Sequence, residues 1–342
     1  MHYDVVIVGA GPGGLACATR LSQNGASTLV IERKPHIGPK VCAGGITWSG
    51  LLKTVPEQLI EKAFPCQHVW SRLQNICVSS ETPIIATVDR KNLGRYMADA
   101  AKAAGVKIHT STSLRHLTDS GAELFHHPSS ERSIVSFDYL IGADGSTSSV
   151  RRHLGIPTNK VGIGINYQLP CTGSKMEWHL NNRYFGNGYG WIFPHKESTS
   201  IGAYSPTAIA ALHLKKRLCQ WSLGRGYDLS QHPCKAGYIN YDYRGHHFNR
   251  TFLIGDAGGF ASALTGEGIY PAIITGESVA SKIIDPNSDL SDLDEVIRRQ
   301  RKFAGMVSLT SKSGILSAIL AEVGVFALRN NMINFTMLEM GK

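Results

Sequence analysis

The sequence lacks any apolar run of 18 or more residues, so no segment is expected to cross a lipid bilayer on its own. It also lacks a Cys-x-x-Cys pair, which leaves little support for a zinc site or a cysteine-bound iron–sulfur cluster. Charged residues make up only 18% of the 342 residues, while apolar residues make up 42%. This composition excludes a disordered chain, a collagen, a coiled coil and a disulfide-rich miniprotein.

The cysteine content and the net charge predict the compartment of the protein and the kind of partner that it binds. Seven cysteines, without a signal peptide, favour free thiols and a cytoplasmic location. The net charge of +9 favours an anionic partner, and we expect that this partner is not a nucleic acid. Residues 211–250 carry seven basic and two acidic residues, which predicts a solvated basic face or, alternatively, a phosphate-binding patch. The histidine pairs 126–127 and 246–247 are expected at the surface, and no metal site is predicted.

The N-terminal segment predicts a dinucleotide site. Residues 3–8 form a continuous apolar run typical of a buried parallel strand, and a helix around 15–24 and a strand over 27–31 follow. The intervening G-A-G-P-G-G matches G-x-G-x-x-G, whose glycines permit a tight turn, close approach of a pyrophosphate, and helix–strand packing. Glu32 ends the second strand, where an acid can accept hydrogen bonds from both ribose hydroxyls. The predicted contacts are Gly9, Gly11, Pro12, Gly13, Gly14, Glu32 and Arg33.

Two later segments favour FAD as the dinucleotide. Residues 138–145 and 251–259 each predict a strand that runs into a polar glycine turn, and a long flavin cofactor needs several distant strand ends. Together with the first motif, the A-D-G turn with S-x-V-R at 143–151 and the G-D pair at 255–256 resemble the FAD-dependent family of p-hydroxybenzoate hydroxylase type. The resemblance implies further cofactor contacts from Arg90, Asp144, Asp256, Gly268 and Ile269.

Simpler roles stay open for some of these positions. Arg90 is alternatively a surface charge at a helix start, and Asp256 is alternatively a helix N-cap, a role that is compatible with cofactor binding. Residues 265–269 are alternatively a plain glycine turn. If the helix that begins there points at the flavin, its partial positive charge favours the reduced, anionic ring.

Two narrower features resemble the geranylgeranyl reductase family. P-K-V-C-A-G-G at 39–45 resembles its cysteine–glycine–glycine turn, and Y-G-W-I-F-P at 189–194 resembles its Y-x-W-x-F-P motif, although Tyr204 stands where the family has a second glycine after Gly202. The resemblance implies that Cys42, Ala43 and Gly44 lie at the flavin, with Cys42 as a candidate catalytic proton donor. It also implies that Tyr189, Trp191 and Phe193, which share one face of a strand, line a substrate tunnel. Ordinary core packing is the alternative for the aromatic residues, and a small buried hydrophobe is the alternative for Cys42.

The predicted fold is α/β. A doubly wound, Rossmann-like FAD-binding domain is formed by residues 1–65, 85–158 and 250–285, with glycine- and proline-rich loops up to about Pro65. An inserted antiparallel β-sheet substrate domain, with one helix over 208–221, is formed by residues 66–84 and 159–249. Residues 286–342 form C-terminal helices that are expected to pack on the FAD domain or, alternatively, to contact a membrane surface.

The predicted function is reduction of C=C bonds in a geranylgeranyl-type isoprenoid or isoprenoid lipid, with hydride from N5 of the reduced flavin. A FAD-dependent aromatic monooxygenase and a flavin electron carrier are the alternatives. The electron donor is expected to be NAD(P)H or a ferredoxin-like protein, since no second nucleotide-binding motif is present.

Overall fold

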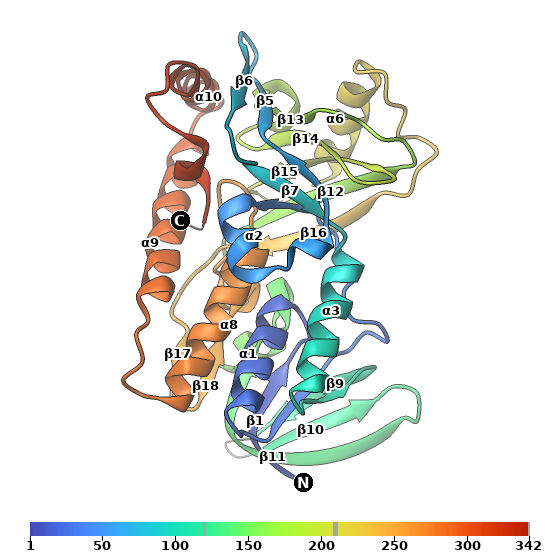
Figure 1. The fold of residues 1–342 in the computed structure, drawn as a ribbon, viewed down its shortest axis with the longest axis vertical. Coiled ribbons are helices and arrows are strands. Elements are labelled where there is room, and N and C mark those ends of the chain that lie inside the picture. The colour runs from blue at the N-terminus through green and yellow to red at the C-terminus, as the bar shows by residue number, and fades with distance from the viewer. Residues whose placement is uncertain (119–120, 208–210, 341–342) are drawn as a thin grey trace.

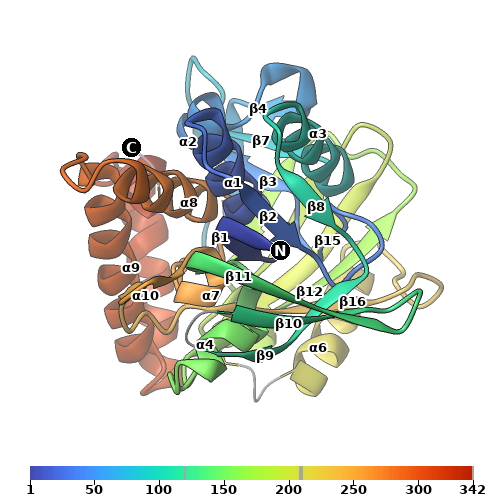
Figure 2. The same cartoon turned by 90° about the horizontal axis from the view of Figure 1, so that it is seen from below.

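A computed structural model describes residues 1–118, 121–207 and 211–340. Its largest sheet has eight strands, six of them in the order β17-β18-β11-β1-β2-β8, and all neighbours from β18 to β8 run parallel. Strand β17 pairs with β18 in antiparallel orientation, and β9 and β10 join the sheet through an antiparallel pairing of β10 with β11 (Figure 2). The strand predicted before the glycine motif and the strand predicted after its helix are therefore adjacent, and their carboxyl ends meet at one edge of the sheet. The strands are β1 (His2–Val8), β2 (Thr28–Ile31), β8 (Lys107–His109), β11 (Glu131–Gly142), β17 (His247–Phe248) and β18 (Thr251–Leu253).

The two faces of this sheet are covered differently. Apolar residues of α1, α3 and α8 pack on one face, because Val5 and Ile7 of β1 alternate with Val6 and Val8 toward the other. The second face is covered by the antiparallel strands β9 and β10 and by the short α4 rather than by long helices. These elements are α1 (Pro12–Gln23), α3 (Arg90–Ala103), α4 (Ser149–His153), α8 (Ile269–Ile284), β9 (Thr112–Leu117) and β10 (Gly121–His126).

A second sheet of seven strands has the order β16-β12-β15-β14-β13-β5-β6. It is antiparallel as predicted except for the pair β13–β5, which runs parallel. Helix α6 (Ala211–Leu223) packs against one face, and the start of the predicted helix, 208–210, lies outside the described residues. The strands are β5 (Cys66–Trp70), β6 (Asn75–Ser79), β12 (Val161–Leu169), β13 (Met176–His179), β14 (Tyr189–Pro194), β15 (Thr199–Ser205) and β16 (Lys235–Asn240).

A small three-stranded sheet, β3-β7-β4, joins the two larger ones. Residues up to Pro65 were expected to be loops, and that expectation is wrong for β3, α2 and β4. These strands have three to five residues and pair through β7, which lies far along the chain, so no local pattern marks them. The elements are β3 (Gly45–Thr47), α2 (Trp48–Thr54), η1 (Glu57–Leu59), β4 (Ile60–Phe64) and β7 (Ile85–Val88).

The C-terminal region is helical, as predicted. Helix α9 packs against α8 through Leu293, Val296 and Phe303, and the chain then returns to bury Met340 in the same cluster. Helix α10 lies beside the β5–β6 hairpin at the far end of the molecule from the N-terminal sheet (Figure 1). The remaining elements are α5 (Asn182–Phe185), η2 (Gly145–Thr147), α7 (Gly255–Gly258), α9 (Ser291–Thr310), α10 (Gly314–Arg329) and η4 (Phe335–Leu338).

The histidine pairs are only partly at the surface, which corrects the prediction. His126 and His246 are half-buried, while their neighbours His127 and His247 are exposed. A ring nitrogen of His126 is hydrogen-bonded to the Thr112 hydroxyl at 3.1 Å. The other inward residue, His246, is hydrogen-bonded through Nδ1 to the Tyr243 hydroxyl at 2.9 Å, so one residue of each pair is held by a polar contact inside the fold.

Candidate active site

A cavity of about 1700 Å³ runs between the parallel sheet and the seven-stranded sheet. It exceeds the roughly 300–1,000 Å³ of an ordinary ligand pocket, so it has room for a second ligand beside a dinucleotide. Its walls come from the carboxyl ends of the parallel strands, from β14, and from α9 and α10. Every residue predicted for the cofactor or the substrate lines this cavity, while the contact of each with a ligand stays a prediction.

The glycine motif forms a backbone cradle at one end of the cavity. Gly9 has a φ of +109°, and a Cβ on it would lie 2.4 Å from the Ala143 carbonyl oxygen. A Cβ on Gly14 would lie 2.1 Å from the Gly9 carbonyl oxygen, so both positions require glycine. A Cβ on Gly11 would meet only the Ala143 oxygen, at 4.0 Å. The protein therefore does not itself demand glycine at position 11, whereas a phosphate that approaches the backbone does.

Glu32 closes the other side of this cradle. One oxygen of its carboxylate accepts a hydrogen bond from the Ala10 N–H and the other from the Lys34 N–H, both at 3.0 Å. A carboxylate has about four acceptor positions, so two stay open toward the cavity for ribose hydroxyls. Arg33, next along the chain, is exposed at the cavity rim.

Two buried polar groups at this end have unused hydrogen-bonding capacity. Arg90, the first residue of α3, is 9% exposed, and its Nε and Nη1 have no partner among the described residues. The Oδ1 of Asp144 is likewise buried without a partner in the part of the chain that the structure describes, while Oδ2 accepts from the Ser149 N–H and hydroxyl. A buried guanidinium without a counter-ion is costly, so Arg90 fits a phosphate-bearing ligand.

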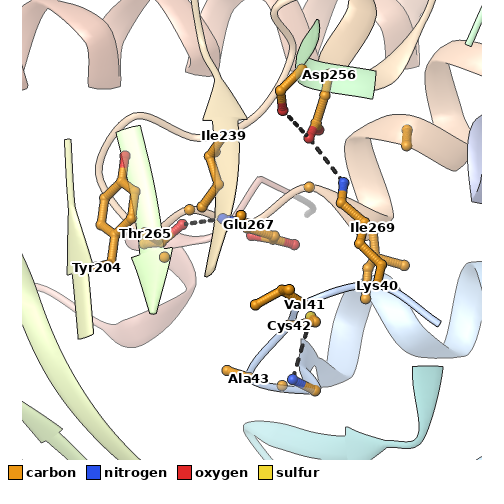
Figure 3. Close-up of a pocket in the computed structure, with 18 of the residues that line it drawn as sticks. Lys40, Val41, Cys42, Ala43, Tyr204, Ile239, Asp256, Thr265, Glu267 and Ile269 are labelled. Atoms are coloured by element: carbon orange, nitrogen blue, oxygen red, sulfur yellow. Dashed lines mark hydrogen bonds and ion pairs between the residues drawn. The ribbon is translucent and has the colours of Figure 1, made fainter. Parts of the chain in front are cut away.

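Asp256 is held from two sides at the end of β18. Its Oδ2 accepts from Lys40 Nζ at 3.0 Å and from the Ser146 hydroxyl at 2.9 Å (Figure 3). The buried Arg151 fixes the same region, because its guanidinium donates to the backbone oxygens of Ala257 and Asp242. Lys40, whose partner the sequence did not reveal, thus ties the loop after β2 to the G-D motif.

Helix α8 begins at the cavity, with Gly268 as its N-cap and Ile269 as its first residue. The preceding Glu267 has one carboxyl oxygen that accepts from the Met340 N–H at 2.9 Å, while the other is buried without a hydrogen bond among the described residues. Burial raises the pKa of this carboxyl group to about 7, although the Met340 N–H opposes the shift. Figure 3 shows Glu267 beside Thr265 of its own loop, across from the segment that carries Val41 and Cys42.

The loop that contains Cys42 is fixed by contacts with the seven-stranded sheet. The Gly44 N–H donates to Cys42 Sγ at 3.3 Å, and the Cys42 carbonyl accepts from Asn166 of β12. Gly44 has a φ of +84°, and a Cβ there would lie 2.3 Å from the ring of His195. That histidine is buried, hydrogen-bonded to Glu61 at 2.5 Å, and close to the Ala43 carbonyl at 3.0 Å. His195 was not among the predicted site residues. The sequence feature that could have indicated it is its position directly after the Y-x-W-x-F-P motif.

Aromatic side chains form the wall next to this loop. Tyr189, Trp191 and Phe193 share one face of β14, as predicted, and Trp178 of β13 lies 4.7 Å from Phe193, centroid to centroid. Tyr189 donates to the Thr265 carbonyl at 2.5 Å and so joins the wall to the loop before α8. Tyr204 is buried and donates to the Ala263 carbonyl, so it supports the same loop where the related family has glycine.

Comparison with known proteins agrees with this geometry. The family model of the FAD binding domain matches residues 2–172, so the chain belongs to this family of FAD-binding proteins and takes FAD as its cofactor. Within that class, the predicted relation to the geranylgeranyl reductases is confirmed. The chain is 28% identical to a digeranylgeranylglycerophospholipid reductase of Methanocaldococcus jannaschii, over 83% of this chain and 78% of that one.

Further relatives have similar names. A chloroplastic geranylgeranyl diphosphate reductase of Oryza sativa is 25% identical, over 82% of this chain and 66% of that one. A crystal structure of a geranylgeranyl bacteriochlorophyll reductase-like protein from Thermoplasma acidophilum superposes with a TM-score of 0.83 at 21% identity, over 98% of this chain and 94% of that one. A probable FAD-dependent monooxygenase from Pseudomonas aeruginosa shares the fold with a TM-score of 0.69 at 18% identity, over 95% and 100% of the two chains. These structural matches establish the fold.

Proposed function

We propose that the protein is an FAD-dependent oxidoreductase that reduces C=C bonds of a geranylgeranyl-type isoprenoid or isoprenoid lipid. The observation that carries this proposal is the cavity, which continues from the polar cradle past Tyr189, Trp191 and Phe193 to the apolar residues of α9 and α10. Apolar and aromatic walls suit a long hydrocarbon chain. The names of the relatives support the same substrate class.

FAD, when bound and reduced, supplies the hydride for such a reaction. The chain's own residues have three tasks. The glycine cradle and Arg90 bind the cofactor, and the aromatic wall excludes water and orients the alkene. A proton must also reach the second alkene carbon, and we assign its delivery to Cys42 Sγ, because Cys42 lines the cavity together with Tyr189 and Glu267.

The proposal also covers the electron donor and the cellular location of the protein. NAD(P)H or a ferredoxin-like protein is the proposed reductant. All seven cysteine thiols are free, which supports a location in the reducing cytoplasm. No helix among the described residues is long and apolar enough to cross a membrane, and we propose that a lipid substrate is met at the membrane surface.

The test is anaerobic turnover of chemically reduced holoenzyme with geranylgeranyl lipids, followed by mass spectrometry. A product heavier by two hydrogens for each bond reduced supports the proposal. Hydroxylated product with NAD(P)H consumption in air indicates a monooxygenase instead, and flavin reduction without any turnover indicates an electron carrier. Cys42→Ala is expected to slow reduction about 100-fold with an unchanged flavin spectrum, and an unchanged rate would remove Cys42 from the mechanism.

A further inference from the structure

Helix α10 combines an apolar sequence with little burial. Only Ser317, Val325 and Leu328 of its 16 residues are buried. Ile315, Ile319, Val323 and Phe326 are 53–75% exposed, and their spacing places them on one outward stripe of the helix. Leu73, at the tip of the β5–β6 hairpin beside α10, is 80% exposed. We name this surface of five residues the α10 patch. Scattered exposed apolar residues are normal, but a contiguous group indicates an interaction site.

The α10 patch is continuous with the cavity. Val323 belongs both to the patch and to the cavity wall, and Leu320 of the same helix is 38% exposed and also lines the cavity. Met306 and Leu309 at the end of α9 are likewise half-exposed and line the cavity. The cavity wall therefore continues into the exposed apolar surface through Leu320 and Val323, and these side chains give a hydrocarbon chain an apolar path from one to the other.

The charges around the patch are mainly positive and exposed. Arg72, Lys312 and Arg329 are exposed at the hairpin and at the two ends of α10. Glu322 is the acidic residue of the helix, and its carboxylate accepts hydrogen bonds from the Ser71 hydroxyl and the Leu73 N–H. An apolar stripe with a cationic border complements an anionic lipid leaflet, where the stripe enters the acyl region and the cations meet the headgroups.

We infer that the α10 patch docks the protein on one leaflet of an anionic lipid membrane, so that a lipid substrate enters the cavity between α9 and α10 directly from the bilayer. This inference rests on the proposed function for the identity of the substrate. The docking itself is independent of catalysis, so the two fail separately. Because α10 inserts only its outer stripe, the binding is reversible and depends on vesicle charge.

The experiment measures sedimentation of the full-length holoenzyme with phosphatidylglycerol vesicles and with neutral phosphatidylcholine vesicles. The wild type is expected to bind the anionic vesicles, and I315Q/I319Q to bind them at least about tenfold more weakly, because neither isoleucine is then buried in lipid. The matched control Ile134→Gln replaces an isoleucine that is 76% exposed on β11, and its binding is expected to be unchanged. Lys312→Glu is expected to weaken binding to the anionic vesicles only.

Activity separates docking from catalysis. I315Q/I319Q is expected to keep wild-type turnover of a detergent-dispersed substrate and to lose turnover of a vesicle-embedded one, since neither residue lines the cavity. Vesicle binding that survives in I315Q/I319Q, or a wild type that binds no vesicle, overturns the inference. So does a wild-type dimer that I315Q/I319Q converts to a monomer, because the patch is then covered by a second copy of the chain.

Discussion

The polar end of the cavity, around the glycine motif, is built from backbone turns and fixed charged side chains, while the apolar end, around β14 and α10, is built from aromatic and aliphatic side chains. At the polar end, strand ends and glycine turns bring N–H groups and fixed charges to defined positions, so one ligand geometry is selected. At the apolar end, aromatic rings and exposed aliphatic residues limit only cross-section and polarity. From this difference we expect the protein to select its cofactor tightly and its substrate mainly by shape.

The largest expected effect tests the backbone cradle. Gly14→Ala places a Cβ 2.1 Å from the Gly9 carbonyl oxygen, and we expect loss of the folded FAD domain. The matched variant Gly11→Ala meets no atom closer than 4.0 Å, so we expect it to fold normally and to bind FAD at least about tenfold more weakly. Far-UV circular dichroism and flavin absorbance measure both results. If Gly14→Ala bound FAD and had the Tm of the wild type, the claim that position 14 requires glycine would be contradicted.

The second prediction concerns Glu267, which lies at the junction of the two ends. Its carboxyl pKa of about 7 in the folded protein exceeds the unfolded value of 4.5. The stabilisation from the neutral carboxyl is therefore fully present below pH 4.5 and is lost as the pH rises to 7, a change on the order of 3 kcal/mol in the free energy of unfolding. Glu267→Gln removes this pH dependence.

Thermal denaturation between pH 4 and 8 measures the Glu267 effect. The Tm of Glu267→Gln is expected to exceed that of the wild type most at pH 8. Glu131→Gln, at an exposed position, is the control and follows the wild type. If the Tm of Glu267→Gln changed with pH in the same way as the Tm of the wild type, the raised pKa of the Glu267 carboxyl would be contradicted.

The third prediction tests the charge at the polar end. Arg90→Met is expected to weaken FAD binding about 10- to 100-fold, because a charge-assisted contact with the cofactor phosphate is lost. The Tm of the apoprotein is not expected to fall, since the variant removes a buried cation whose Nε and Nη1 lack partners in the described chain. Arg90→Lys keeps the charge and serves as the comparison. Calorimetric titration with FAD measures the affinities, and equal affinities for all three proteins would exclude a role for Arg90.

The smallest effect concerns the apolar end. Tyr189→Phe removes the hydrogen bond to the Thr265 carbonyl, and we expect a loss of about 1 kcal/mol in the free energy of unfolding with FAD affinity unchanged. Tyr238→Phe is the control, because Tyr238 is half-exposed and its change is expected to be negligible. Urea denaturation measures both. A weakened FAD affinity in Tyr189→Phe would show that the aromatic wall also shapes the cofactor end.

Sequence patterns predicted the parts of the site that depend on local backbone. The strand–glycine–helix unit, the turns at Asp144 and Asp256, and the alternation in β14 follow from short-range periodicity and from glycine's freedom at positive φ. The ion pair of Lys40 with Asp256 joins residues 216 positions apart, and the His195–Glu61 pair joins residues 134 apart. No local pattern encodes such pairings, because their partners are set by how distant elements pack.

By itself, the sequence determined the cofactor class and the family, because phosphate-binding turns need particular residues at fixed short spacings. Only the tertiary structure decided that the aromatic wall, the buried carboxyl of Glu267 and one edge of α10, with Leu320 and Val323, line one continuous cavity. The physical reason is that burial and exposure depend on which surfaces meet, and an apolar helix has the same sequence whether it is covered or faces outward.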